Sequence, residues 1–279
     1  GCQHLTMFVD VQQKLLFYAV CAWSDEFSGA VLDYGAWPDP QRAYFSLRDV
    51  TQTLATAAPG TGLEGAIYAG LTALTDRQLA REWPREDGAS LRIERCLIDA
   101  NWGTSTDVVY QYCRQSPHAA LLLPSHGRFV GAASLPFADY KRRPGDRVGL
   151  NWRIPGVMGK RAVRHVSFDT NFWKSFVFTR LAVAMADKGA LALYGQQPEA
   201  HRLFAEHLTA EYHVRTEGRG RTVDEWKPRP GQADNHWLDC LVGCAVGASI
   251  LGVKLSEHQP GSVSVKPVRI KLSELQRGR

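Results

Sequence analysis

The sequence lacks the features that mark membrane, secreted and zinc-binding proteins. No run of 18 apolar residues occurs, which excludes a membrane-spanning helix, and the first residues carry no basic-then-apolar signal peptide. We therefore expect an intracellular protein with no membrane partner. No two of the six cysteines form a CxxC pair, and most lie inside apolar runs, which favours reduced, core-filling thiols over disulfides or zinc ligands.

Motifs of two common enzyme classes are also missing. A serine hydrolase needs a G-x-S-x-G turn, and Ser125-His126 stands in no such context. An ATPase needs a GxxxxGK[ST] phosphate loop, and the nearest segment, Gly156 to Lys160, has the wrong spacing and no following Ser or Thr. The sequence therefore offers neither serine hydrolase chemistry nor a nucleotide-driven motor.

What the sequence has is an ordinary globular composition with an uneven charge distribution. Hydrophobic residues make up 44% and charged residues 22% of a chain of 279 residues, long enough for one large domain or two modest ones. The formal net charge is +5, yet eight basic residues and one acid, Asp146, lie between Lys141 and Arg164. Such a patch suits a polyanion, and nucleic acid is the obvious candidate.

Apolar runs alternating with helical spacing predict an α/β protein. Three strands joined by tight turns, at 7–11, 14–23 and 28–34, predict an antiparallel meander. Further strands are expected at 92–99, 119–123, 164–168 and 190–194, and helices at 49–58, 62–82, 103–115, 170–187, 198–208 and 235–252. The basic segment 135–163 is predicted to be an extended loop outside the core, and residues 211–227 a hairpin.

The last of these helices opens on an unusual group of polar side chains. Asp234, His236 and Asp239 stand at the start of an otherwise apolar, small-residue helix, where charged groups need partners. Asp234 is predicted to be the N-cap, and Asp239 to head a stripe that Gly243 and Gly247 continue. A helix without bulk along one face can lie very close to a sheet, so Asp239 is expected to be held over the strands.

Two of the expected strands end in an aspartate, Asp10 and Asp99. Together with Asp239 they form a set of three carboxylates drawn from distant parts of the sequence. Mg²⁺ and Mn²⁺ prefer oxygen ligands, and two such ions about 4 Å apart can stabilise both the attacking and the leaving oxygen of a phosphodiester displacement. The competing interpretation is that the two strand-end aspartates only cap loops.

Five segments, in order along the chain, make the sequence resemble a known family. They are Phe8-Val9-Asp10-Val11-Gln12, Leu97-Ile98-Asp99-Ala100-Asn101-Trp102-Gly103, Asp169-Thr170-Asn171-Phe172-Trp173-Lys174, Arg221-Thr222-Val223-Asp224-Glu225-Trp226-Lys227 and Asp234-Asn235-His236-Trp237-Leu238-Asp239-Cys240. The chain resembles the C-terminal nuclease half of the large terminase subunit of tailed bacteriophages, in its lambda-like branch. The resemblance implies an RNase H-like α/β fold, with a mixed five-stranded central sheet whose first three strands form the antiparallel meander, flanked by helices.

The resemblance also implies a reaction. It implies a metal-dependent endonuclease that cuts concatemeric double-stranded DNA by two-metal-ion hydrolysis, with two Mg²⁺ or Mn²⁺ ions per active site. Asp10, Asp99 and Asp239 would be catalytic: Asp10 bridging both metals, Asp99 binding from the adjacent strand and Asp239 from the helix. Asp234 and His236 stay open as further metal ligands, and His236 is otherwise a donor to a ligand, a proton shuttle or an ordinary core histidine.

The basic residues are expected to grip the DNA backbone without reading bases. From the segment 135–163 and the hairpin we assign this role to Lys141, Arg142, Arg143, Arg147, Arg153, Lys160, Arg161, Arg221 and Lys227. Four residues can orient phosphate or the attacking water, although a lysine is usually only an exposed surface residue: Lys14, Asn101, Lys174 and Lys227.

The missing phosphate loop bears on domain organisation, because the family's full-length subunit carries an ATPase motor before the nuclease. We therefore expect an excised domain, with residues 1–6 a linker remnant, 7–255 the nuclease domain and 256–279 a basic C-terminal tail. The implied partners are double-stranded DNA, the N-terminal ATPase motor, the small terminase subunit and the portal, in the host bacterial cytoplasm. Two alternatives stay open: another RNase H-like nuclease, such as a junction resolvase or an RNA–DNA hybrid nuclease, and a catalytically silent DNA-binding or capsid-docking module.

Overall fold

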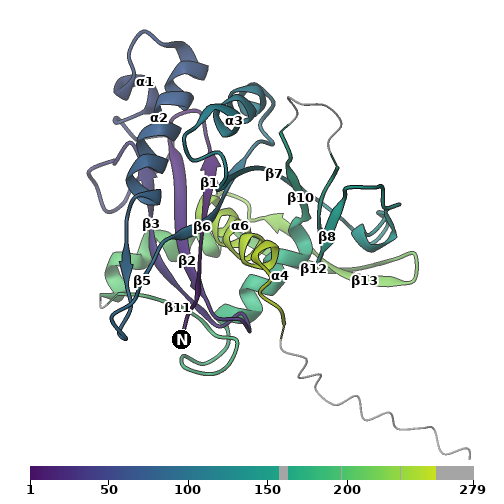
Figure 1. Ribbon diagram of the computed structural model, residues 1–279. Helices are drawn as coiled ribbons and strands as arrows, with labels where there is room; N and C mark the ends of the chain where they lie inside the picture. Colours follow the sequence, from purple (N-terminus) through teal and green to yellow (C-terminus); the bar gives the residue numbers. More distant parts are fainter. Residues whose placement is uncertain (157–162, 196, 233, 256–279) are drawn as a thin grey trace, which may run out of the picture.

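A mixed sheet of nine strands forms the centre of the molecule (Figure 1). The computed structural model describes residues 1–156, 163–195, 197–232 and 234–255. In the order β11-β3-β2-β1-β6-β7-β10-β9-β8, the sheet contains β1 (His4–Val11), β2 (Leu16–Trp23), β3 (Gly29–Trp37), β6 (Ile93–Asp99), β7 (Leu122–Arg128), β8 (Arg147–Gly149), β9 (Trp152–Ile154), β10 (Val166–Asp169) and β11 (Leu191–Leu193). Two separate hairpins pair β4 (Trp83–Pro84) with β5 (Ser90–Leu91) and β12 (Glu211–Gly218) with β13 (Arg221–Pro228).

The strand directions bring several carboxyl ends to one edge of the sheet. β1 runs antiparallel to β2, and β2 antiparallel to β3, which confirms the predicted meander. β1, β6, β7 and β10 run parallel to one another in that order. Their carboxyl ends therefore share one edge, the usual place for a site in an open α/β sheet.

The expectation of a five-stranded sheet is wrong in number. β3, β2, β1, β6 and β7 stand next to one another in the middle of the sheet, and four more strands extend it on both sides. β8 and β9 form inside the basic segment 135–163, predicted as a loop, where Trp152 and Ile154 are buried. Each of these strands has only three residues, which leaves too little alternation for a sequence pattern to reveal.

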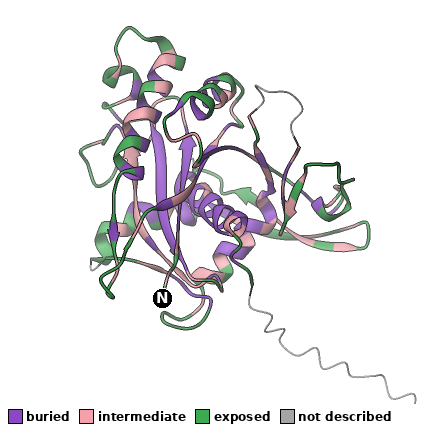
Figure 2. Cartoon of the chain, in the orientation of Figure 1, coloured by how far each residue is buried: buried purple, intermediate pink, exposed green. Residues whose placement is uncertain are grey.

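Helices cover both faces of the sheet (Figures 1 and 2). The helices are α1 (Leu54–Ala57), α2 (Gly62–Leu79), α3 (Gly103–Gln115), α4 (Thr170–Leu181), α5 (Arg202–Leu208) and α6 (His236–Leu251), with short 3₁₀ turns η1 (Phe137–Asp139) and η2 (Pro198–His201). Phe8 of β1 packs in a core with α4, α5 and α6, while its neighbours Met7 and Val9 pack in a second core with α2 and α3. Successive side chains of a strand point to opposite faces, so the sheet separates these two cores. None of the described helices is long and apolar enough to cross a membrane.

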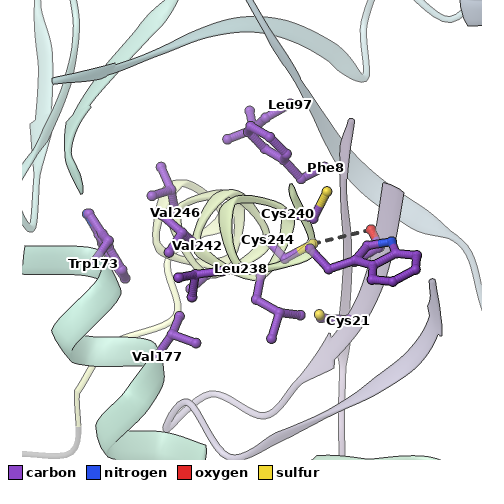
Figure 3. Packing of buried hydrophobic residues seen from close by; sticks show 14 of the residues in the cluster. Phe8, Cys21, Leu97, Trp173, Val177, Leu238, Cys240, Val242, Cys244 and Val246 are labelled. Carbon is purple, nitrogen blue, oxygen red and sulfur yellow. Dashed lines mark hydrogen bonds between the residues drawn. The ribbon is translucent and has the colours of Figure 1, made fainter. Parts of the chain in front are cut away.

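Helix α6 packs among the buried side chains around Phe8 of β1 (Figure 3), and its glycines allow it to lie close to that strand. A Cβ atom on Gly243 would collide with the ring of Phe8, and one on Gly247 would come within 3.3 Å of the Thr6 side chain. The Thr6 hydroxyl donates to the carbonyl oxygen of Cys244 at 2.9 Å, which holds the helix against the strand. The stripe of small residues therefore allows the close approach that the sequence predicted.

Several other element boundaries differ from the prediction, and two of them have a clear local cause. The helix predicted at 49–58 is only α1, because the hydroxyl of Thr53 accepts from the backbone N–H of Thr56 and caps the helix there. β7 runs through Pro124 to Arg128 instead of ending at residue 123, because its last four residues pair with β10.

Candidate active site

The ends of β1 and β6 place two carboxylates side by side. Val9 pairs with Ile98 across the parallel ladder, and Asp10 and Asp99 come directly after these residues. Phe8 packs against α6, and a side chain two residues further along a strand points to the same face. Asp10 therefore leaves the sheet on the α6 side, with Asp99 beside it.

Asp239 joins this pair from the first turn of α6. It lies four residues before Gly243, which packs on β1, so it faces the same strand. Burial raises the pKa of Asp99 well above its usual range, and the negative charges of Asp10 and Asp239 raise it further. The backbone N–H of Asn101, 3.3 Å from Oδ1 of Asp99, lowers this pKa but does not outweigh these effects. The structure thus brings together the three predicted carboxylates, which we call the acidic edge.

A charged histidine holds the buried Asp10. The Nδ1 atom of His236 is 2.7 Å from Oδ2 of Asp10, and its Nε2 atom is 3.7 Å from Oδ1 of Asp234, close enough for charge attraction but too far for a hydrogen bond. Burial lowers the pKa of His236, but the two carboxylates outweigh burial and raise it to about 10. The imidazolium is therefore charged at neutral pH. Gln12 Nε2 also donates to both oxygens of Asp10 at 3.1 Å.

Asp234 is not the N-cap that the sequence predicted. α6 begins at His236, Asn235 occupies the cap position, and no side chain there accepts from the first turn. The Asp234 carboxylate accepts from the backbone N–H of Leu47 at 3.3 Å instead, and its pKa is lowered chiefly by its interaction with His236. The oxygens of Asp234 thus face the Leu47 backbone and the His236 ring instead of the first turn of α6, and the attraction to His236 helps to orient that ring.

A second cation, Lys174 of α4, holds Asp239. Its Nζ atom lies 3.1 Å from Oδ1 of Asp239 and 2.6 Å from Oε1 of Glu211, and the side-chain amide of Asn235 donates to the same Glu211 oxygen. Burial lowers the pKa of Lys174, but the two acids reverse this effect and raise it. Burial raises the pKa of Asp239, and Lys174 opposes that rise. Lys174 is only 8% exposed, so the expectation of a surface lysine is wrong.

Sequence reasoning missed Glu211, and it did not count a third strand-end acid, Asp169, among the site residues. Glu211 opens β12 and is buried, but it begins a polar hairpin, and nothing in that local pattern marks it. Asp169 ends β10 and caps α4, accepting from the N–H groups of Asn171 and Phe172 at 3.0 and 3.2 Å. Burial raises the pKa of Asp169 to about 6, against these two hydrogen bonds. Asp169 is thus a helix cap, a structural role like the loop capping that the competing interpretation gave to Asp10 and Asp99.

A hydrogen-bonded network supports the loop after Asp99 from the opposite face of the sheet. The side-chain oxygen of Asn101 lies 3.1 Å from Nδ1 of His126, whose Nε2 lies 2.9 Å from the hydroxyl of Tyr110 on α3. The Asn101 amide donates to the carbonyl oxygen of Gly127 at 2.8 Å. Burial lowers the pKa of His126 to about 4, helped by cationic neighbours, so its ring is neutral and can accept one of these bonds. Asn101, whose backbone N–H donates to Asp99, is therefore held in place by its side-chain contacts with His126 and Gly127.

Comparison with known proteins decides the family. A family model described as the endonuclease domain of the terminase large subunit gpA matches residues 1–259. The chain belongs to this family. The resemblance read from the five segments is thereby confirmed, and membership supports an endonuclease role in phage DNA packaging with DNA as substrate. No curated protein and no solved structure matches the chain.

The basic residues that the sequence assigned to DNA divide into free and engaged side chains. The exposed ones without a side-chain partner among the described residues are Lys141, Arg142, Arg143 and Lys227. Arg147 is exposed and donates to the Ile250 carbonyl at 3.4 Å, and Arg153 pairs with Asp146 at 3.0 Å. Arg221 donates to three carbonyl oxygens of residues 131–134, at 2.6 to 3.2 Å. Lys160 and Arg161 lie outside the described residues, as does the tail predicted at 256–279.

The acidic edge has the donor chemistry of a divalent metal site. Its oxygens are the ligands that Mg²⁺ and Mn²⁺ prefer, and a cation would relieve the like-charge repulsion that raises the pKa of Asp99. Among the described residues, no group of three or more His, Cys, Asp or Glu side chains is arranged to hold an ion. Asp10 and Asp239 are paired with His236 and Lys174 instead.

Proposed function

We propose that the chain is a metal-dependent endonuclease domain that cuts concatemeric double-stranded DNA during phage packaging. The observation that carries the proposal is the convergence of Asp10, Asp99 and Asp239 at one edge of the sheet, inside a chain of the gpA endonuclease family. These three carboxylates would hold two Mg²⁺ or Mn²⁺ ions. Such ions, when bound, activate water and stabilise the charge that develops on the phosphodiester.

The chain's own residues position these ligands. His236 fixes the orientation of Asp10 and is itself oriented by Asp234. Lys174, backed by Glu211, fixes Asp239. The N–H of Asn101 fixes Asp99. Partners of this kind commonly change metal affinity or activity tenfold to about a hundredfold when they are removed.

The fold that we propose for the catalytic core is RNase H-like. The adjacent strands β3, β2, β1, β6 and β7 support this, since an antiparallel meander is followed by parallel strands with acids on the two central ones. We propose a nuclease domain that begins with β1 at His4 and ends at 255, because Leu5 and Thr6, which the sequence assigned to a linker at 1–6, are buried in that strand. A basic tail follows at 256–279. The partners proposed for it are an ATPase motor, the small terminase subunit and the portal, in the host cytoplasm.

A plasmid-nicking assay with Mg²⁺ or Mn²⁺ tests the assignment of the carboxylates. Asp10→Asn, Asp99→Asn and Asp239→Asn should each lower the rate by at least about a hundredfold, because each removes an anionic ligand. Asp169→Asn is the matched control: asparagine also caps helices, so this variant should keep near wild-type activity. Wild-type cutting by all three variants would disprove the assignment.

Metal binding itself has a readout independent of cutting. Mn²⁺ should raise the melting temperature of the wild-type protein and of Asp169→Asn, since a ligand that binds only the folded state stabilises it. Asp99→Asn should lose that increase. The pairing of Asp10 and Asp239 with cations favours a second candidate function, a catalytically silent DNA-binding module. This candidate would be supported if metal stabilised the protein but the protein cut no duplex, junction or hybrid substrate.

A further inference from the structure

A cavity of about 670 Å³ lies beside the end of β7, away from the acidic edge. We call it the aromatic cavity, and the residues that define it are Arg128, Phe129, Leu135, Tyr140 and Arg153. Ser167 of β10 and Arg153 of β9 also pair with each other. Their neighbours Phe168 and Trp152 point into the core beneath α6, so the cavity opens on the opposite, α3 side of the sheet.

The cavity gathers side chains that are normally hidden. Of the eight large hydrophobic side chains exposed among the described residues, three line it: Phe129 at 57%, Leu135 at 45% and Tyr140 at 41%. Such a cluster of exposed apolar surface is typical of a binding site. Its volume falls within the range of about 300 to 1,000 Å³ found for small-molecule sites.

The charge around the cavity is positive. Arg128 is exposed and makes no side-chain hydrogen bond or ion pair with any residue that the structure describes. The guanidinium of Arg153 lies 5.2 Å from the ring centre of Tyr140, and one of its nitrogens pairs with Asp146, but its buried Nε atom has no acceptor. No acidic residue is among the described residues that line the cavity. A ligand with an anionic group and a flat apolar ring satisfies both features.

The cavity is joined to the acidic edge by a single residue. Gly127, which lines the cavity, accepts from the side-chain amide of Asn101, and the backbone N–H of Asn101 donates to Asp99. The cavity and the acidic edge therefore lie on opposite sides of the sheet and are linked at the ends of β6 and β7.

We propose that the aromatic cavity binds one unpaired nucleotide of the DNA strand, with its base stacked on Phe129 or Tyr140 and its phosphate against Arg128. The proposal rests on the proposed function, because it takes DNA as the substrate. A paired base inside a duplex has both faces covered by its neighbours, so a concave site with exposed rings selects an unpaired one. Stacking on aromatic side chains and charge contact with the backbone are the usual means of holding single-stranded nucleic acid.

Fluorescence anisotropy of the full chain in EDTA tests this nucleotide site. The probes are a short fluorescein-labelled oligothymidylate and a labelled duplex of the same length. Phe129→Ala should weaken binding of the single strand roughly tenfold, equivalent to about 1.4 kcal/mol, and change duplex binding by less than about twofold. Arg128→Gln should weaken single-strand binding and reduce the slope of log K against log salt by about 0.7. Tyr194→Ala removes another exposed ring, outside the aromatic cavity, and should leave both affinities unchanged.

Photo-cross-linking locates the base directly. An oligonucleotide carrying 5-iododeoxyuridine should cross-link to Phe129 or Tyr140, as mapped by mass spectrometry. Equal single-strand affinity of wild type and Phe129→Ala, or cross-links confined to other segments, would overturn the proposal. The two proposals fail separately: cross-linking at Phe129 by a protein that never cuts DNA leaves the nucleotide site standing, and cutting without such cross-links leaves the nuclease standing.

Discussion

The acidic edge and the aromatic cavity lie at the ends of neighbouring strands, and they hold their charges in opposite ways. At the acidic edge the two cations, His236 and Lys174, are buried, and each contacts two carboxylates. At the aromatic cavity Arg128 is exposed with no partner among the described residues, and Phe129 is 57% exposed. The charged groups of the acidic edge pair with one another, whereas Arg128 and the rings of the aromatic cavity stay accessible to a ligand.

The difference follows from the cost of burying charge. A buried ion without a partner costs several kcal/mol, so the acidic edge can be built only with its cations in place. Those cations also fix the directions of Asp10 and Asp239. An exposed cavity carries no such cost and keeps its groups free for a ligand. Substitutions at the acidic edge should therefore reduce stability together with activity, whereas substitutions in the cavity should reduce binding alone.

The largest expected effect comes from Lys174→Met. The substitution removes the cation between Glu211 and Asp239, which leaves the buried Glu211 and the partly buried Asp239 without a cationic partner. The free energy of unfolding should fall by about 3 to 5 kcal/mol. Arg128→Met is the matched change in the aromatic cavity and should cost less than about 0.5 kcal/mol. Urea unfolding followed by circular dichroism measures both. Equal losses for the two variants would contradict the contrast drawn between these regions.

A smaller effect is expected for His236→Asn. Asparagine keeps a polar side chain but loses the charge that holds Asp10, so the nicking rate should fall tenfold to about a hundredfold. Positioning of a catalytic group changes kcat more than KM, and that split separates this role from simple loss of folded protein. His165→Asn is the control, because among the described residues the His165 side chain makes only ring contacts. A wild-type kcat for His236→Asn would show that Asp10 needs no such partner.

Many of the strands and helices could be predicted from the sequence, because they depend on patterns of residues close together in the chain. The strands of the meander appear as apolar runs ended by turns, and the glycine stripe that lets α6 approach Phe8 recurs every four residues. The acids at the ends of β1 and β6 follow from the same patterns, because each closes an apolar run. Local chemistry was enough to place these features.

The pairing of charges was not accessible, because it joins distant parts of the chain. Lys174 and Glu211 are 37 residues apart, and His236 and Asp10 are 226 apart. No local pattern distinguishes a lysine that the fold will bury from one that it will expose. The same limit applies to Asp234, which is placed like an N-cap in the sequence but takes Leu47 as its partner across 187 residues.

The smallest expected effect separates free from engaged arginines among the residues proposed to bind DNA. Arg142→Gln removes an exposed charge, so the slope of log K against log salt for duplex binding should fall by about 0.9 while stability stays within about 0.5 kcal/mol. Arg221→Gln should do the reverse, since its guanidinium donates to three carbonyl oxygens of the segment 131–134. Losing those charge-assisted bonds should lower stability by roughly 1.5 to 3 kcal/mol and leave the salt slope nearly unchanged. A reduced slope for Arg221→Gln at wild-type stability would mean that this side chain leaves the carbonyls to bind phosphate.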